Sequence, residues 1–136
     1  MKTKVCADCR RELPTTDFQS KGKNTHRLQS YCKECSARKA RGYKQQMRDY
    51  VAAYKLAKGC EICGFQPKHS CQLDLDHNDP GTKVYKGSHK AYDAGWSKER
   101  IDAELAKCTV TCKNCHALRT YEERHWENSY TSVRMR

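Results

Sequence analysis

Apolar side chains are scarce in this chain. Only 37% of its 136 residues are hydrophobic, and they include just two phenylalanines and two tryptophans. No stretch approaches the run of about 20 apolar residues that a transmembrane helix needs, which excludes a membrane-spanning segment. A chain of this size with so few apolar residues cannot bury a large core, so we expect metal ions or disulfides to stabilise it.

An apolar signal segment is absent as well, since Met1–Val5 lead directly into Cys6. We therefore expect a cytoplasmic protein. Thiols stay reduced in the cytoplasm, and paired cysteines there are typical of metal sites rather than disulfides.

Acidic residues are few beside the basic ones. Against 16 Asp and Glu stand 27 Lys and Arg, which gives a formal net charge of +11, and most of the excess lies in residues 1–59. A charge of this size favours a polyanionic partner, most commonly nucleic acid. A solvated basic surface without a partner is the alternative.

The ten cysteines include four Cys-x-x-Cys pairs. Each pair is half of a tetrahedral zinc site, so the four pairs predict two structural zinc ions. Grouping pairs that are neighbours in the chain costs the least loop closure. The first site then consists of Cys6, Cys9, Cys32 and Cys35, and the second of Cys60, Cys63, Cys112 and Cys115. Cross-pairing of the halves and redox-active thiols are the alternatives, and Cys71 and Cys108 are interpreted as small buried apolar residues rather than ligands.

Residues 36–58, between the two sites, contain no proline and carry an apolar stripe at helical spacing. The stripe consists of Tyr43, Met47, Tyr50, Val51 and Tyr54. Gly59 follows where a helix C-cap belongs. Beside the stripe lies a basic edge, which we interpret as a contact for the DNA backbone; a solvated edge of an ordinary connecting helix is the alternative. Its members are Arg41, Lys44, Arg48 and Lys55.

The C-terminal half predicts the order of a ββα unit. The expected elements are a strand at Cys71–His77, a turn at Asn78–Gly81, a helix capped by Ser97, a strand at Thr109–Thr111 and a helix from Asn114 to Trp126. With the cysteine sites, this pattern predicts a small zinc-stapled α+β protein.

Two histidines and an aspartate accompany the second cysteine site. Hydrolysis of a phosphodiester at a one-metal site needs a cation on the phosphate and a base for the attacking water. Asp76 and His116 offer ligands for the cation, and His77 is the candidate base. Asp74, on the same strand face as Asp76, either supports the cation or is a plain polar residue. Each histidine taken alone is better explained by local hydrogen bonding, and only the combination with Asp76 and the cysteine pairs favours catalysis.

Two segments resemble the HNH (ββα-metal) endonuclease family. Residues 73–80, LDLDHNDP, are similar to its "DHxxP" segment, and residues 107–116, KCTVTCKNCH, to the "KCxxxCxNCH" segment of phage and prophage members related to the endonuclease VII group. Residues 1–45 resemble an extra N-terminal zinc module in some of these phage proteins. The resemblance implies a nuclease that leaves 5′-phosphate and 3′-hydroxyl ends, located in the bacterial host cytoplasm if phage-encoded.

The same resemblance implies catalytic roles for His77 as general base, for Asp76 and His116 as ligands of one Mg²⁺ or Mn²⁺, and for Asn114 as the middle letter of the motif. Two positions depart from the family. Lys107 stands where many members carry asparagine, and Thr120 where many carry a second histidine. A missing third ligand predicts a weaker, more exchangeable cation site.

The predicted domains are an N-terminal Cys₄ zinc module (1–40), a basic amphipathic helix (41–59), an HNH nuclease domain (60–127) and a flexible tail (128–136). The expected partner is double-stranded DNA, cut with little sequence specificity because Lys and Arg contact phosphates rather than bases. A homodimer and phage packaging proteins are further candidate partners. Three other functions stay open: a non-catalytic zinc-ribbon regulator that binds nucleic acid, a phage packaging accessory protein, and a nuclease that resolves branched DNA.

Overall fold

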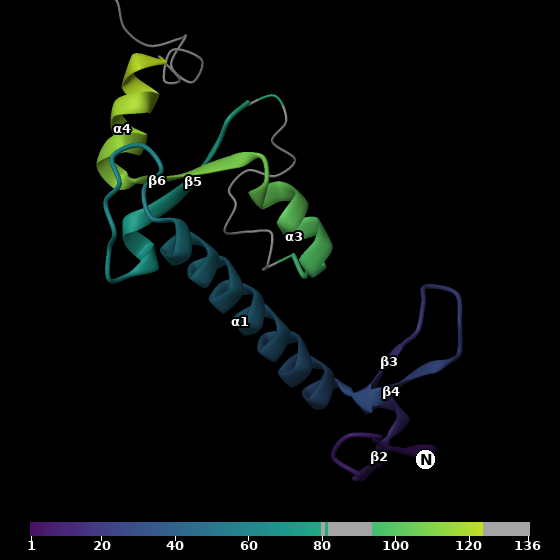
Figure 1. The fold of residues 1–136 in the computed structure, drawn as a ribbon. Coiled ribbons are helices and arrows are strands. Elements are labelled where there is room, and N and C mark those ends of the chain that lie inside the picture. The colour runs from purple at the N-terminus through teal and green to yellow at the C-terminus, as the bar shows by residue number, and fades with distance from the viewer. Residues whose placement is uncertain (80, 82–93, 124–136) are drawn as a thin grey trace, which may run out of the picture. The chain divides into compact units, whose positions relative to one another are not determined.

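The computed structural model describes residues 1–79, 81 and 94–123. They form a small α+β protein, as predicted, with three α-helices and three two-stranded antiparallel sheets in these ranges (Figure 1). The chain divides into two compact units, Met1–Gln46 and Met47–Arg136. The expected tail and the expected helix end at Trp126 lie outside the described residues. No helix of the described part is long and apolar enough to cross a membrane.

The N-terminal unit consists of two hairpins and the start of a long helix. β1 (Thr3–Val5) pairs with β2 (Glu12–Pro14), and β3 (Phe18–Ser20) pairs with β4 (Leu28–Cys32). A 3₁₀ turn at Thr15–Asp17 joins the hairpins. The buried residues at its centre are Cys6, Phe18, Cys32 and Cys35. Since three of these four are cysteines, the cysteine group takes the place of an apolar core.

The long helix α1 runs over Lys33–Lys58. It begins well before residue 41, where the connecting helix was expected, and its first turn contains Cys35. The apolar stripe starts only at Tyr43, so periodicity detects the part of the helix that has an apolar face and misses the polar first turns.

The predicted stripe of α1 faces the interior. Met47 and Val51 are buried, and the three tyrosines of the stripe are half-buried. At the other end Gly59 has a φ of 66°, and its N–H donates to the carbonyl of Lys55 at 2.9 Å. This left-handed residue ends the helix and confirms the predicted cap.

In the C-terminal unit, β5 (Leu73–His77) follows a short 3₁₀ turn at Ser70–Gln72 and pairs antiparallel with β6 (Cys108–Cys112). α3 (Lys98–Leu105) lies between them in sequence, and α4 (Lys113–Glu122) continues directly from β6 (Figure 1). One buried cluster of this unit is half cysteine and consists of Cys60, Leu73, Val110 and Cys112. Trp96, Ile101 and Leu105 are among the other buried apolar residues of the unit. Both predicted strands and both predicted helices are present in this half, but the first strand begins at Leu73 rather than Cys71, because Ser70–Gln72 form the 3₁₀ turn. The predicted cap of α3 is confirmed, since the Ser97 hydroxyl accepts the Arg100 N–H at 3.4 Å.

Each unit opens its cysteine group with the same turn. The residue after the second cysteine of the pair is left-handed, with φ 60° at Arg10 and φ 77° at Gly64. Its N–H donates to the carbonyl of the first cysteine, at 3.0 Å for Cys6 and 2.9 Å for Cys60. The turn brings both sulfurs of a pair to one side, which a pair of metal ligands requires.

Replacing Arg10 by glycine is expected to stabilise the N-terminal unit. A left-handed conformation costs a residue other than glycine roughly 1 kcal/mol, and the Arg10 side chain is exposed. We expect Arg10→Gly to raise the free energy of unfolding by up to about 1 kcal/mol in chemical denaturation of the zinc-loaded protein. The matched control, Gly64→Ala, should lower it by a similar amount; a shift in the same direction for both variants would contradict this account.

Candidate metal centres and a histidine–carboxylate cluster

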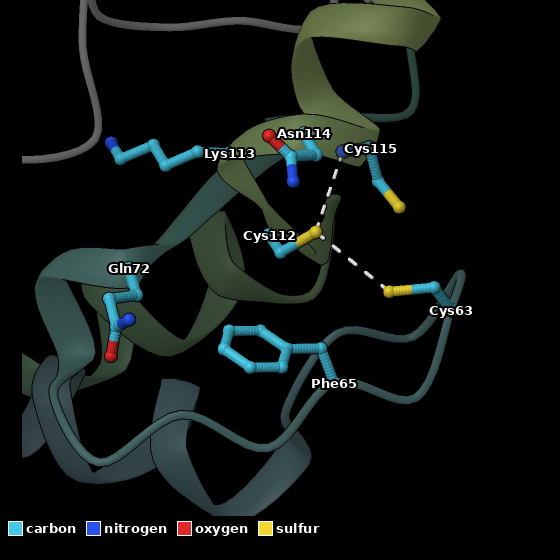
Figure 2. Close-up of a pocket in the computed structure, with 7 residues that line it drawn as sticks. All are labelled: Cys63, Phe65, Gln72, Cys112, Lys113, Asn114 and Cys115. Atoms are coloured by element: carbon cyan, nitrogen blue, oxygen red, sulfur yellow. Dashed lines mark hydrogen bonds between the residues drawn. The ribbon is translucent and has the colours of Figure 1, made fainter.

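The eight paired cysteines form two groups, each with four sulfurs within 4.8 Å of one another. The groups are Cys6, Cys9, Cys32 and Cys35, and Cys60, Cys63, Cys112 and Cys115. This is the predicted grouping, and it excludes cross-pairing. Tetrahedral Zn–S bonds of about 2.3 Å place sulfurs about 3.8 Å apart. The sulfurs of Cys63 and Cys112 are 3.8 Å apart (Figure 2), so the arrangement fits zinc.

The local environment favours the thiolate form of some cysteines in each group and disfavours it for others. The N–H of Cys32 donates to the sulfur of Cys6 at 3.3 Å. Burial alone raises the pKa of Cys6 and Cys60, but backbone hydrogen bonds outweigh it and lower the pKa of both to about 6. Neighbouring sulfurs and burial raise the pKa of Cys115 to about 12, and burial with neighbouring sulfurs raises that of Cys35. Cys115 and Cys35 therefore need the charge of a metal ion to release their protons.

A histidine–carboxylate cluster adjoins the second cysteine group. Asp74 and Asp76 lie on one face of β5, and His116 lies in α4 directly after Cys115. The Nδ1 of His116 is 2.9 Å from Asp74 Oδ2, and its Nε2 is 3.8 Å from Asp76 Oδ1. Because the cysteine group fixes the start of α4, it also fixes His116.

Asp74 sets the proton position on His116. Burial raises the pKa of Asp74, but hydrogen bonds from Lys113 and His116 outweigh it and lower this pKa. An ionised carboxylate only accepts hydrogen bonds, so Nδ1 of His116 donates and the Nε2 lone pair stays free. A carboxylate holding the far nitrogen is typical of metal-binding histidines, which favours the supporting role for Asp74.

Two cationic side chains of α4 balance the carboxylates. Lys113 Nζ is 2.5 Å from Asp74 Oδ1, and Arg119 Nη1 is 3.1 Å from Asp76 Oδ2. Within the described residues, no third His, Cys, Asp or Glu joins Asp76 and His116 in a metal-ligand group. The Thr120 hydroxyl, at the position of the second histidine in many family members, donates to the His116 carbonyl at 2.8 Å.

His77 lies on the opposite face of β5 from this cluster. Its side chain is 7% exposed, and its Nε2 is 2.6 Å from Glu104 Oε1 on α3. Burial raises the pKa of Glu104, but hydrogen bonds from His77 and Lys107 outweigh it and lower this pKa. The structure therefore brings Asp76 and His116 together and pairs His77 with Glu104.

Lys107, at the position where many family members carry asparagine, donates to Glu104 Oε2 at 3.0 Å. It thus belongs to the His77 side of the sheet. Asn114 is exposed at the start of α4 and lines a hollow beside the cysteine group (Figure 2).

Two residues that contact the predicted site residues, Arg119 and Glu104, are not among the predicted ones. Arg119 comes three residues after His116, and helical i, i+3 spacing could have placed both on one face. Glu104 carries no such signal, because α3 reaches His77 only through the fold.

The predicted basic edge has unequal members. Arg41 and Arg48 are exposed, and Lys44 is half-buried. Lys55 Nζ donates to the carbonyl of Leu73 at 2.8 Å, and burial lowers the pKa of Lys55. Lys55 therefore joins α1 to the start of β5, so its charge is partly used inside the unit.

A comparison of the chain with protein-family models, curated proteins and solved structures found no match. A function has to be argued from the cysteine groups and the cluster beside them.

Removing one cysteine should remove one zinc ion. We expect about two ions per chain by elemental analysis, and about one in Cys112→Ser or Cys32→Ser, because a structural site needs its four ligands. Zinc binding energy is folding energy in such modules, so each variant should unfold its own unit. Cys71→Ser is the matched control, since Cys71 is exposed and outside both groups. Loss of both ions from one substitution would contradict two separate sites.

Proposed function

We propose that the C-terminal unit is an HNH (ββα-metal) endonuclease, which hydrolyses phosphodiester bonds in DNA with one Mg²⁺ or Mn²⁺. The observation that carries the proposal is the approach of Asp76 Oδ1 to His116 Nε2 at 3.8 Å. With ligand bonds of about 2.1 Å each, one cation can touch both atoms across such a gap. The chain order β5, β6, α4, with a cysteine group at the start of the last helix, supports the same interpretation.

In this proposal Asp76 and His116 hold the cation, and Asp74 orients the ring of His116. When bound, the cation supplies positive charge on the scissile phosphate. Arg119, 3.1 Å from Asp76, is a second positive group for charge that develops on the phosphate. With only two protein ligands, the cation would keep several waters and exchange readily.

His77 is the proposed general base. The ionised carboxylate of Glu104 accepts a hydrogen bond from the N–H at Nε2 of His77. The Nδ1 of His77 is then the nitrogen that can accept a proton. A carboxylate in this position fixes the tautomer and stabilises the imidazolium that forms. DNA is the proposed substrate because the chain has a net charge of +11. Contacts of basic side chains with DNA phosphates give affinity without selecting a base sequence.

One alternative has an observation in its favour. His77 is buried against Glu104 on the far face of β5 from Asp76, as a purely structural pair would be. The chain would then be a zinc-stabilised nucleic-acid-binding protein without catalysis.

A supercoiled-plasmid assay separates the two functions. We expect the zinc-loaded protein to nick plasmid with Mg²⁺ or Mn²⁺, and His77→Ala to lower the rate by about 10²- to 10⁴-fold, the usual contribution of a positioned base. Asp76→Asn should abolish the metal-dependent rate. Both variants should retain zinc and DNA affinity. An intact plasmid under all conditions, with unchanged DNA binding by His77→Ala, would leave the binding protein as the function.

Asp74→Asn tests the orientation of His116. Loss of the supporting carboxylate should weaken cation affinity by roughly 10- to 100-fold, so the nicking rate should fall at low Mg²⁺ and recover at high Mg²⁺. Asp17→Asn, an exposed carboxylate of the other unit, is the control. A rate that stays low at saturating Mg²⁺ would contradict a positioning role.

A further inference from the structure

A hollow of about 550 Å³ lies beside the second cysteine group. Its walls include Phe65, Gln72, Lys113 and Asn114, and three cysteines of the group form its inner end. Figure 2 shows the Phe65 ring on one side, with Lys113 and Asn114 across from it on α4. A structural zinc ion is enclosed by its four sulfurs, so it would close the inner end and leave the space between Phe65 and α4. The volume of about 550 Å³ includes this inner end, so the space for a ligand is the outer part beside Phe65, Lys113 and Asn114.

The backbone of Phe65 is held in place, and its ring is open to solvent. The N–H of Cys60 donates to the carbonyl of Phe65 at 2.9 Å, which ties this residue to the cysteine turn. The side chain is nevertheless 45% exposed. An exposed aromatic face at a hollow is a stacking surface, and every nucleobase has a π-face that suits it.

The polar groups around the ring suit a base and its phosphate. The carboxamide of Asn114 is exposed, and Gln72 uses its Oε1 to accept the His69 N–H at 3.4 Å, so its amide nitrogen remains as a donor. Such amides pair with the edges of bases. Lys113 adds a cation at the rim, and its Nζ contacts Asp74, which in turn contacts His116.

We propose that this hollow binds one unpaired base of the DNA substrate, stacked on Phe65 with its edge toward Asn114 and Gln72. Lys113 lies between the hollow and the cluster, so a nucleotide held there has its phosphate beside Asp74 and His116. The substrate class is therefore DNA with an extrahelical or single-stranded nucleotide next to the cleaved bond. This inference rests on the proposed nuclease function for the position of the cut, but the binding of the base can be tested without cleavage.

The test uses three duplexes that differ at one position: a single bulged nucleotide, the same bulge with an abasic residue, and a fully paired control. Affinities of the zinc-loaded full chain are measured by fluorescence anisotropy without added Mg²⁺ or Mn²⁺. We expect the bulged base to bind more tightly than the abasic bulge by about 5- to 100-fold, the usual range for stacking on an aromatic side chain.

Phe65→Ala should remove this preference and leave the affinity for paired DNA unchanged. Ile62→Ala is the matched control, because Ile62 is a 53% exposed apolar residue of the same turn that does not line the hollow. It should keep the preference. If Phe65→Ala loses zinc, Phe65→Leu replaces it, since leucine keeps bulk without an aromatic face.

Equal affinities for base and abasic bulges, or an equal loss with all three duplexes in the Phe65 variants, would overturn the proposal. A base preference in a protein that, with Mg²⁺ or Mn²⁺, cleaves neither plasmid nor the bulged duplex would refute the nuclease and keep the hollow as a base-binding site. Nicking without a base preference would support the nuclease and refute the hollow as a base-binding site.

Discussion

Four cysteine sulfurs converge in each unit, and the surrounding elements are positioned by that convergence. In the C-terminal unit Cys60 and Cys63 come from the turn after α1, and Cys112 and Cys115 from the junction of β6 and α4. Their meeting places Glu61 beside β6, where its carboxylate accepts the Val110 N–H at 2.7 Å. A metal-linked group of this kind replaces much of the apolar burial that a larger domain would use.

β5 separates two kinds of chemistry because alternate side chains of a strand point to opposite faces. Asp74 and Asp76 meet the cationic side chains Lys113 and Arg119 of α4. His77 faces inward to Glu104 on α3. The proposed cation ligands and the proposed base thus lie in different environments, although Asp76 and His77 are adjacent in the chain.

Basic side chains stabilise the C-terminal unit through internal contacts, and one of them also borders the hollow. Lys55, Lys107 and Arg119 make internal contacts with a carbonyl or a carboxylate, so they stabilise the C-terminal unit. Lys113 does both: it neutralises Asp74 and also borders the hollow next to Phe65. The formal net charge therefore overstates how much positive charge is left for contacts outside the protein, while one shared lysine connects the cluster to the hollow.

The sequence determined the features that depend on spacing along the chain. These are the two cysteine groups, the strand and helix order of the C-terminal half, the caps at Gly59 and Ser97, and the position of Asp76 and His116 beside one cysteine group. Only the tertiary structure decided that α4 covers the Asp76 face of β5 while Glu104 pairs with His77 on the other. The alternation of side chains along a strand predicts that adjacent residues point to opposite faces of the sheet. Which helix packs on which face depends on long-range contacts that no local sequence pattern encodes.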